Sequence, residues 1–294
     1  MDNAIEDLEF RFEFLRVGHR ATRFSTRRAE PIVLLHPFSL CPEVWKPILP
    51  ELEKHHPVYS LGLPGHHGTD PLPHDFDHSI ESAVDLMEQK LDEVGIERAH
   101  LVGNSLGGWI AIELARRGRA LSVVAIAPGG GWEAGSPEEE RLVRKFKLTN
   151  LLLRLGGPLS LMMANYALTR RVFLGDAVAR PERLEPEDAA LFIDAARRCT
   201  CYMGIVEALP RQPAPSAFEA LPCPIRVIWG THDRVLPLEG YSGRWQRLLT
   251  GADWVTIENV GHVPMYDDPK RVAEAILEWT RSALGYDEPP RLAS

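Results

Sequence analysis

Three residues have the types and the sequence context for nucleophilic acyl transfer. Ser105 lies within a Gly-x-Ser-x-Gly motif that spans residues 103–107. A serine hydroxyl is a weak nucleophile at neutral pH, so it needs a neighbouring base, and that base needs an acid to orient it. His262, in the segment Gly-His-Val-Pro, is the candidate base, and Asp233, in Gly-Thr-His-Asp, is the candidate acid. These residues predict a catalytic triad of Ser105, His262 and Asp233.

The motif around Ser105 lies at a predicted strand-to-helix turn, which can hold a nucleophile above the edge of a sheet. It directly follows the apolar run 99–103 and directly precedes a helical run that begins at Leu106. A strand-to-helix turn of this kind is tight and strained, so glycines must flank the serine to avoid Cβ clashes. The turn points the hydroxyl at a helix N-terminus, whose free amides favour developing negative charge.

Two backbone amides are candidates for binding the oxyanion of a tetrahedral intermediate. Such a site usually takes one amide from the residue after the nucleophile and one from an early loop that follows a strand. Leu106 supplies the first amide. In the loop 35–39, Pro37 has no N–H, so the amide of Phe38 is the natural second donor.

The candidate residues need a scaffold in which strand ends meet, and the hydrophobic pattern predicts one. Short, nearly continuous apolar runs are typical of strands buried on both faces of a parallel sheet. Helical stretches alternate with these runs, which predicts an α/β fold with a mostly parallel central sheet flanked by helices. In such sheets, functional groups collect at the carboxyl ends of the strands. The predicted strands are 31–36, 58–61, 99–103, 121–126, 225–229 and 254–257, and the predicted helices are 43–55, 79–94, 106–117, 241–249 and 269–284.

Two segments depart from this alternation. Residues 8–17 alternate apolar and polar side chains and then turn into residues 20–24, which predicts an N-terminal antiparallel hairpin at the sheet edge. Residues 131–219 are helical in pattern and lie between Gly-rich and Pro-rich sequence. They predict an inserted helical cap subdomain within a core domain formed by residues 1–130 and 220–294.

Three residues of the predicted cap are candidates for contact with a substrate. Trp132 follows three glycines and can either flank the mouth of the pocket or anchor the cap. Leu159 and Met162 can either pack within the cap or present adaptable apolar surface to a substrate, since Met fills irregular gaps. Both alternatives stay open for these residues.

Composition narrows the class of protein. The chain has 294 residues, of which 45% are hydrophobic and 25% charged, as is usual for soluble globular proteins. A formal net charge of −8 disfavours a nucleic-acid partner, which needs a basic surface to neutralise phosphates. No apolar run approaches the ~20 residues of a membrane helix, and the N-terminus is acidic where a signal peptide would be basic. We therefore expect a cytoplasmic enzyme with a small-molecule substrate and no nucleic-acid or membrane partner, either a monomer or a homo-oligomer.

The sequence predicts no cofactor and no metal site. The chain has four cysteines, namely Cys41, Cys199, Cys201 and Cys223. No His/Cys partner set lies near them with zinc spacing, which favours buried free thiols in a reducing compartment. The histidines that follow the second predicted strand form no His-Glu-x-x-His pattern, which favours a surface loop over a metal site. These are His66, His67, His74 and His78.

These motifs resemble those of the α/β-hydrolase superfamily along nearly the whole chain. The order Ser, Asp, His along the chain is the one expected for this fold. The inserted helices correspond to the family's cap over the active site. One departure is Pro37, where the family usually has Gly after the His, and it affects the expected geometry of the oxyanion loop. The matching segments are His36-Pro37-Phe38, Leu63-Pro64-Gly65-His66-His67-Gly68, the elbow 103–108, 230–233 and 261–264.

The resemblance leaves several activities open. Haloalkane dehalogenases and epoxide hydrolases of this fold carry Asp at the elbow, so Ser105 argues against both, and proline iminopeptidases usually have Trp where this chain has Leu106. The elbow is similar to those of carboxylesterases and of carbon–carbon bond hydrolases of aromatic ring-cleavage pathways. The latter typically have a Gly-rich oxyanion loop, which residues 37–39 do not match. We therefore expect a serine esterase for a small or medium apolar ester, with a carbon–carbon hydrolase or a slow-turnover ligand-binding receptor as alternatives.

Overall fold

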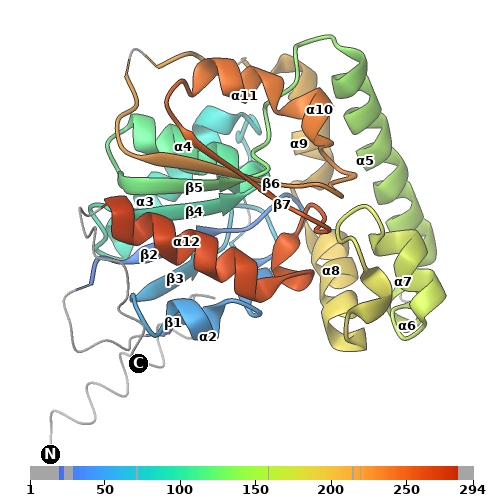
Figure 1. Ribbon diagram of the computed structural model, residues 1–294. Coiled ribbons are helices and arrows are strands. Elements are labelled where there is room, and N and C mark those ends of the chain that lie inside the picture. Colours follow the sequence, from blue (N-terminus) through green and yellow to red (C-terminus); the bar gives the residue numbers. More distant parts are fainter. Residues whose placement is uncertain are drawn as a thin grey trace, which may run out of the picture.

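The computed structural model describes residues 20–22, 29–70, 72–157, 159–213, 215–218 and 220–283 (Figure 1). These residues contain a seven-stranded sheet with the order β1-β3-β2-β4-β5-β6-β7. Strands β2 to β7 are parallel, and β1 pairs antiparallel with β3 at one edge, so the predicted mostly parallel sheet is confirmed. The strands are β1 (Arg20–Thr22), β2 (Ile32–Leu35), β3 (Val58–Leu61), β4 (Ala99–Asn104), β5 (Ala120–Ile126), β6 (Ile225–Gly230) and β7 (Asp253–Ile257).

Helices alternate with the strands, as the hydrophobic pattern predicts. None of the helices within the described ranges is both long enough and apolar enough to cross a membrane. Before β5 they are η1 (Pro42–Trp45), α2 (Leu49–Leu52), α3 (Ile80–Glu93) and α4 (Leu106–Arg116). Between β5 and β6 they are α5 (Pro137–Gly156), α6 (Leu159–Met163), α7 (Ala167–Leu174), η2 (Pro181–Arg183), α8 (Pro186–Arg198), α9 (Tyr202–Ala208) and η3 (Leu209–Arg211). After β6 they are α10 (Leu238–Tyr241), α11 (Gly243–Leu248), η4 (Pro264–Tyr266) and α12 (Pro269–Ala283).

The core lies on both faces of the sheet, because successive residues of a strand point to opposite faces. Ile32 and Leu34 of β2 belong to a buried cluster that includes residues of α2 and α12. Val33 and Leu35 belong to a second cluster, which includes residues of α3, α4 and α11. Burial on both faces explains why the strands read as continuous apolar runs in the sequence.

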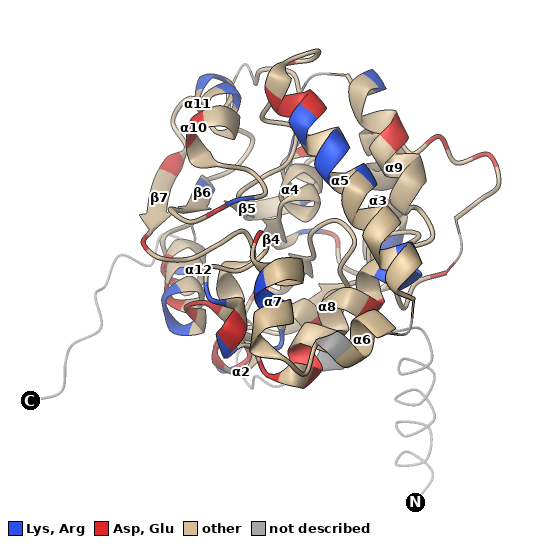
Figure 2. Cartoon of the chain, turned by 90° about the vertical axis from the view of Figure 1, so that its right-hand side faces the viewer, with Lys and Arg blue, Asp and Glu red and all other residues tan. Residues whose placement is uncertain are grey.

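The helices between β5 and β6 lie beyond the carboxyl edge of the sheet. Strand β5 ends at that edge, so the chain that follows emerges there, and Figures 1 and 2 show α5 to α9 gathered on this side. Buried residues of this insertion, such as Leu184 and Phe192, belong to the same cluster as Ile276 of α12. This part of the insertion therefore shares its core with the sheet.

Helix boundaries follow local sequence signals, with one prediction in error. Ser79 begins α3 as predicted, because its hydroxyl accepts a hydrogen bond from the amide of Ser82 at 3.0 Å. The single helix predicted over 43–55 is wrong. Two short helices, η1 and α2, replace it, since Pro47 and Pro50 cannot donate the amide hydrogen bonds of a continuous helix.

The predicted N-terminal hairpin is described only in part. Residues 20–22 form β1, which pairs with β3 so that Arg20 lies opposite Ser60. Residues 8–17, the other predicted strand, and residues 23–24 lie outside the described residues.

Candidate active site

Ser105 occupies a strained turn between β4 and α4. Its backbone angles are φ 55° and ψ −114°, in the positive-φ region that non-glycine residues rarely adopt. Three backbone hydrogen bonds hold it there. Its amide donates to the carbonyl of Ile126 at 2.8 Å, and its carbonyl accepts from Trp109 at 3.0 Å and from Gly129 at 2.9 Å. Strain that the surroundings maintain in this way is common at functional sites.

The glycines beside Ser105 are required by close backbone approaches. A Cβ on Gly103 would lie 2.1 Å from the carbonyl oxygen of Gly107, and a Cβ on Gly107 would lie 2.2 Å from the carbonyl oxygen of Leu35. Both distances are far below van der Waals contact with rigid backbone, so neither position accepts a side chain. The absence of these side chains lets α4 begin against the ends of β2 and β4.

Replacing Ser105 with Gly is expected to give a more stable protein than replacing it with Ala. An unfavourable φ/ψ combination costs about 1–3 kcal/mol for a residue with a side chain. Gly removes this strain, but its greater conformational entropy in the unfolded chain offsets about 0.4–1 kcal/mol of the gain in stability. In urea denaturation we expect Ser105→Gly to exceed Ser105→Ala in unfolding free energy by about 1 kcal/mol. Equal stabilities would show that the turn carries no strain.

Asp233 and His262 meet at the carboxyl ends of β6 and β7, as the sequence predicts for an acid and its base. Both side chains are buried, and Asp233 Oδ2 lies 2.7 Å from His262 Nδ1. The other carboxylate oxygen, Oδ1, accepts hydrogen bonds from the amides of Val235 at 2.9 Å and Leu236 at 2.8 Å. Because an ionised carboxylate only accepts, Nδ1 of His262 must donate, which leaves Nε2 to take a proton.

Asn104, the neighbour of Ser105, connects the end of β4 to the loop of His262. Among the described residues, the Ser105 hydroxyl makes no hydrogen bond to His262. Instead the Asn104 side chain donates from Nδ2 to the carbonyls of His262 and Ile126, each at 3.0 Å. It thereby ties the loop of the base to the strand that ends at the nucleophile. Hydrogen bonds between nucleophile and base are often long without substrate and shorten when it binds.

Asp267 is a second residue of the site that the sequence did not single out. Its Oδ2 accepts from the amides of Gly261 at 2.8 Å and Ala179 at 2.9 Å, so it joins the histidine loop to the insertion. The amide of Val263 also donates to the carbonyl of Ala177 at 2.8 Å. In the sequence, Asp267-Asp268-Pro269 resembles an ordinary helix start. Only Asp268 has that role, because its side chain accepts a hydrogen bond from the backbone amide of Arg271.

His36 fixes the loop that carries Phe38. Its Nδ1 donates to the carbonyl of Pro37 at 2.9 Å, and its Nε2 accepts from the amide of Leu63 at 2.9 Å. Complete burial holds the pKa of His36 well below its usual value, so the ring is neutral and keeps this tautomer. Within the described chain, the amides of Phe38 and Leu106 donate to no protein acceptor.

Apolar side chains line a small cavity beside the residue that follows the nucleophile. The cavity has a volume of about 40 Å³, and the side chains include Leu106 and Trp109 of α4 with Ile205 and Leu209 from the end of the insertion. Four polar residues complete the lining, namely His66, His78, Ser79 and Gln212.

The three cap residues that are candidates for substrate contact do not line this cavity. Trp132 is buried, donates from Nε1 to Glu139 at 3.1 Å and packs edge-on against Trp109, which is the anchoring alternative. Leu159 and Met162 are 59% and 65% exposed and do not line the cavity beside Leu106, so packing within the cap is wrong for both, and contact with a substrate stays a prediction. Helix α6 is only five residues long and four of them are apolar, so its sequence does not show which face meets the rest of the insertion.

His66 also departs from the sequence interpretation. It is buried rather than on a surface loop, and its Nδ1 lies 3.6 Å from the Cys201 sulfur. Cys199 and Cys201 are buried free thiols, as predicted. Their histidine partner is distant in sequence, so the spacing of residues could not show it.

Comparisons with known proteins agree with this architecture. The model of the alpha/beta hydrolase family matches residues 32–275. Epoxide hydrolase EphH of Mycobacterium tuberculosis is 35% identical over 203 residues, which cover 68% of this chain and 95% of that protein. The 2-hydroxy-6-oxononadienedioate/2-hydroxy-6-oxononatrienedioate hydrolase 2 of Pseudomonas putida is 25% identical over 260 residues, covering 85% of this chain and 87% of that protein. A thermophilic esterase from Thermogutta terrifontis is 24% identical and has a TM-score of 0.66, with 87% of this chain and 90% of that chain covered.

The family match spans the sheet from β2 to β7 and the first turns of α12, and it includes the strained turn at Ser105 and the Asp233–His262 pair. The chain therefore belongs to the α/β hydrolase family.

Proposed function

We propose that this chain is a serine hydrolase that cleaves a small or medium apolar carboxylic ester through an acyl-enzyme formed on Ser105. The observation that carries the proposal is the backbone of Ser105, held at φ 55° at the end of β4. A structural turn has no need of a serine there, since glycine would avoid the strain. The hydrogen-bonded pair of Asp233 and His262 at the neighbouring strand ends supplies the base that this serine needs.

Each residue has a defined role in the proposed reaction. His262 Nε2 takes the proton of Ser105 as the hydroxyl oxygen attacks the ester carbonyl carbon, and Asp233 stabilises the resulting imidazolium. The amides of Phe38 and Leu106 bind the oxyanion. The imidazolium then protonates the departing alcohol, and a water molecule, deprotonated by the same imidazole, releases the acid and restores Ser105.

The similarity to an epoxide hydrolase does not transfer that reaction to this chain. A carboxylate nucleophile opens an epoxide to form an ester, which water can hydrolyse at its carbonyl carbon. A serine in its place would form an ether, and an ether offers water no carbonyl to attack. Ser105 therefore favours acyl transfer over epoxide opening.

We also propose that residues 131–219 act as a cap that sets which substrates fit. The insertion follows β5 at the carboxyl edge, where Ser105, Asp233 and His262 lie. It contributes Ile205 and Leu209 to the apolar cavity beside Leu106. An apolar lining of this kind favours an apolar acyl or alcohol group.

The test is turnover of a series of p-nitrophenyl esters, from acetate to decanoate, against a vinylogous diketone as the alternative substrate. Fast ester hydrolysis supports the proposal. Turnover restricted to the diketone would indicate a carbon–carbon hydrolase, and tight binding of ester analogues with negligible turnover would indicate a receptor.

The carbon–carbon hydrolase is the second candidate because of the Pseudomonas putida relative, which is named as a hydrolase of hydroxy-oxo dioates. The loop at Pro37 and Phe38 weighs against it, because the resemblance to that group calls for a Gly-rich segment there.

Enlarging Ile205 tests the proposed acyl cavity. We expect Ile205→Trp to fill the space beside Leu106 and to lower kcat/KM for the longer esters by about 10-fold or more, because each lost methylene contact in an apolar pocket is worth about 1–3 kcal/mol. Acetate hydrolysis should change little. Leu159→Trp and Met162→Trp are matched controls on the exposed surface and should leave the chain-length profile unchanged. A shift caused by the controls and not by Ile205→Trp would place the acyl group elsewhere.

A further inference from the structure

Three buried side chains that can ligate a metal meet where the insertion contacts the loop after β3. His66 comes from that loop, and Cys199 and Cys201 come from the turn between α8 and α9. One potential ligand atom from each residue lies within 4.8 Å of the other two. We propose that His66, Cys199 and Cys201 form a binding site for a thiophilic metal ion, with Zn²⁺ as the ion that fits best.

The spacing of the ligand atoms matches a tetrahedral site. The two sulfur atoms are 3.5 Å apart, and the Cys201 sulfur is 3.6 Å from His66 Nδ1. Bond lengths of about 2.3 Å to sulfur and about 2.0 Å to nitrogen give tetrahedral edges of about 3.8 Å and 3.6 Å. The third pair, Cys199 and His66, has its ligand atoms within 4.8 Å of each other. Two thiolates and an imidazole select Zn²⁺ or Cu⁺ over Mg²⁺ and Ca²⁺.

Backbone contacts hold the ligands in place before any ion binds. The carbonyl of Gly65 accepts hydrogen bonds from the amides of Thr200 at 2.9 Å and Cys201 at 3.3 Å, and from the Thr200 hydroxyl at 2.9 Å. A Cβ on Gly65 would lie 2.9 Å from the Cβ of Cys201, so glycine is what allows the two segments to approach. A site assembled in advance loses less conformational entropy on binding.

The His66 ring is only partly satisfied by the protein. Its Nδ1 lies 3.0 Å from the carbonyl of Pro64 and faces Cys201, while its Nε2 is buried with no hydrogen-bond partner among the described residues. The residue as a whole is only 3% exposed. The nitrogen that faces the thiols is Nδ1, so ligation there replaces its contact with the carbonyl of Pro64 and leaves the environment of Nε2 unchanged.

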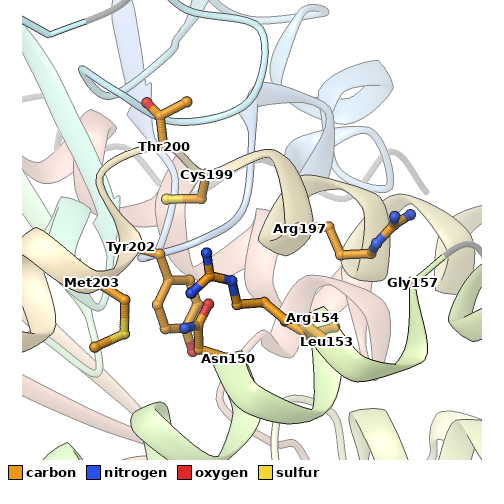
Figure 3. Close-up of a pocket in the computed structure, with 9 residues that line it drawn as sticks. All are labelled: Asn150, Leu153, Arg154, Gly157, Arg197, Cys199, Thr200, Tyr202 and Met203. Atoms are coloured by element: carbon orange, nitrogen blue, oxygen red, sulfur yellow. The ribbon is translucent and has the colours of Figure 1, made fainter.

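A cavity borders one of the three proposed ligands, Cys199. It has a volume of about 520 Å³ and is lined by residues of α5 and by Arg197, Cys199, Thr200, Tyr202 and Met203 (Figure 3). Binding replaces two thiol protons, which leave to solvent, so the two thiolates balance the charge of Zn²⁺. The neutral complex adds no net charge beside Arg154 and Arg197 of the same cavity.

The test is titration of the reduced, metal-free protein with Co²⁺, which reports thiolate ligation by a near-ultraviolet charge-transfer band and tetrahedral geometry by its visible bands. We expect one equivalent to bind, Zn²⁺ to displace it, and Zn²⁺ to raise the melting temperature. Cys199→Ser, Cys201→Ser and His66→Gln should each lose the band or weaken binding at least tenfold. Cys41→Ser and Cys223→Ser are matched controls, since both thiols lie outside the cluster, and they should bind as the original chain does.

Two results would overturn the proposal. One is the absence of a cobalt–thiolate band in a chain whose four thiols are shown to be reduced. The other is a band that survives in the Cys199→Ser/Cys201→Ser double variant. The melting temperatures of the metal-free variants show whether a lost band reflects a lost ligand or a lost fold. A variant that folds but no longer binds Co²⁺ supports the site. If all variants of one ligand unfold, that ligand is tested in the original chain by alkylation of its thiols, which bound Zn²⁺ should slow.

Discussion

Ser105→Ala is expected to abolish nearly all ester hydrolysis, with kcat falling by about 10⁶-fold, as is found when a nucleophilic serine is removed from a triad. The methyl group has no oxygen to form the acyl-enzyme. The amides of Phe38 and Leu106 stay in place, so a residual acceleration of about 10³–10⁴ over water should persist. Initial rates on p-nitrophenyl acetate measure the loss, and mass spectrometry after fluorophosphonate treatment locates the nucleophile.

Ser160→Ala is the matched control for this prediction. Ser160 is also buried, and its hydroxyl donates to the carbonyl of Gly157 at 2.7 Å in the insertion. Its loss should leave kcat unchanged. A phosphonate label on a serine other than Ser105, together with substantial activity in Ser105→Ala, would refute the assignment of the nucleophile.

Asp233→Asn is expected to lower kcat by about 10⁴-fold while leaving the fold intact. The surroundings of Asp233 determine how the amide of the new side chain must lie. Its oxygen has to face the amides of Val235 and Leu236, because an NH₂ group there would oppose two other donors. The NH₂ group then points at His262 Nδ1 and donates to it. This moves the ring proton to Nε2, where it blocks uptake of the serine proton.

The control for this variant is Asp253→Asn at the start of β7. Asp253 pairs with Arg226 at 2.5 Å at the end of the sheet opposite to the triad, so its replacement should not alter kcat. Thermal melts of both variants verify the fold. If Asp233→Asn retained kcat within a few-fold, Asp233 would not orient the base, and the proposed triad would lose its acid.

Local sequence patterns predicted the strands and the start of α3 well, because each of these features depends on residues close together in the chain. The run 225–229 is apolar apart from Arg226 since β6 is buried on both faces, and the same cause applies to the largely apolar strands β2, β4 and β5. The cap of α3 at Ser79 follows from one side chain and one amide three residues later. The exception, residues 43–55, combined helical periodicity with two prolines, and the prolines decided the outcome.

Residues of the insertion were the hardest to interpret from sequence. Trp132, Leu159 and Met162 are all large and apolar, yet one is buried against Trp109 and the other two face outward. The apolar character of a side chain shows that its burial is favourable, but it does not show which surface of the protein the side chain packs against. That choice depends on how the helices of the insertion lie over the sheet.

The sequence by itself determined the parallel sheet, the turn at Ser105 and the strand ends at which Asp233 and His262 lie. These features follow from hydrophobic periodicity, from the sterics of glycine and from chain order, all of which act over short stretches of chain. Only the tertiary structure decided that Asn104 ties the histidine loop to the elbow and that His66 meets Cys201, a residue 135 positions away. Contacts of that kind join segments that are far apart along the chain, and their partners depend on packing geometry, which no local pattern encodes.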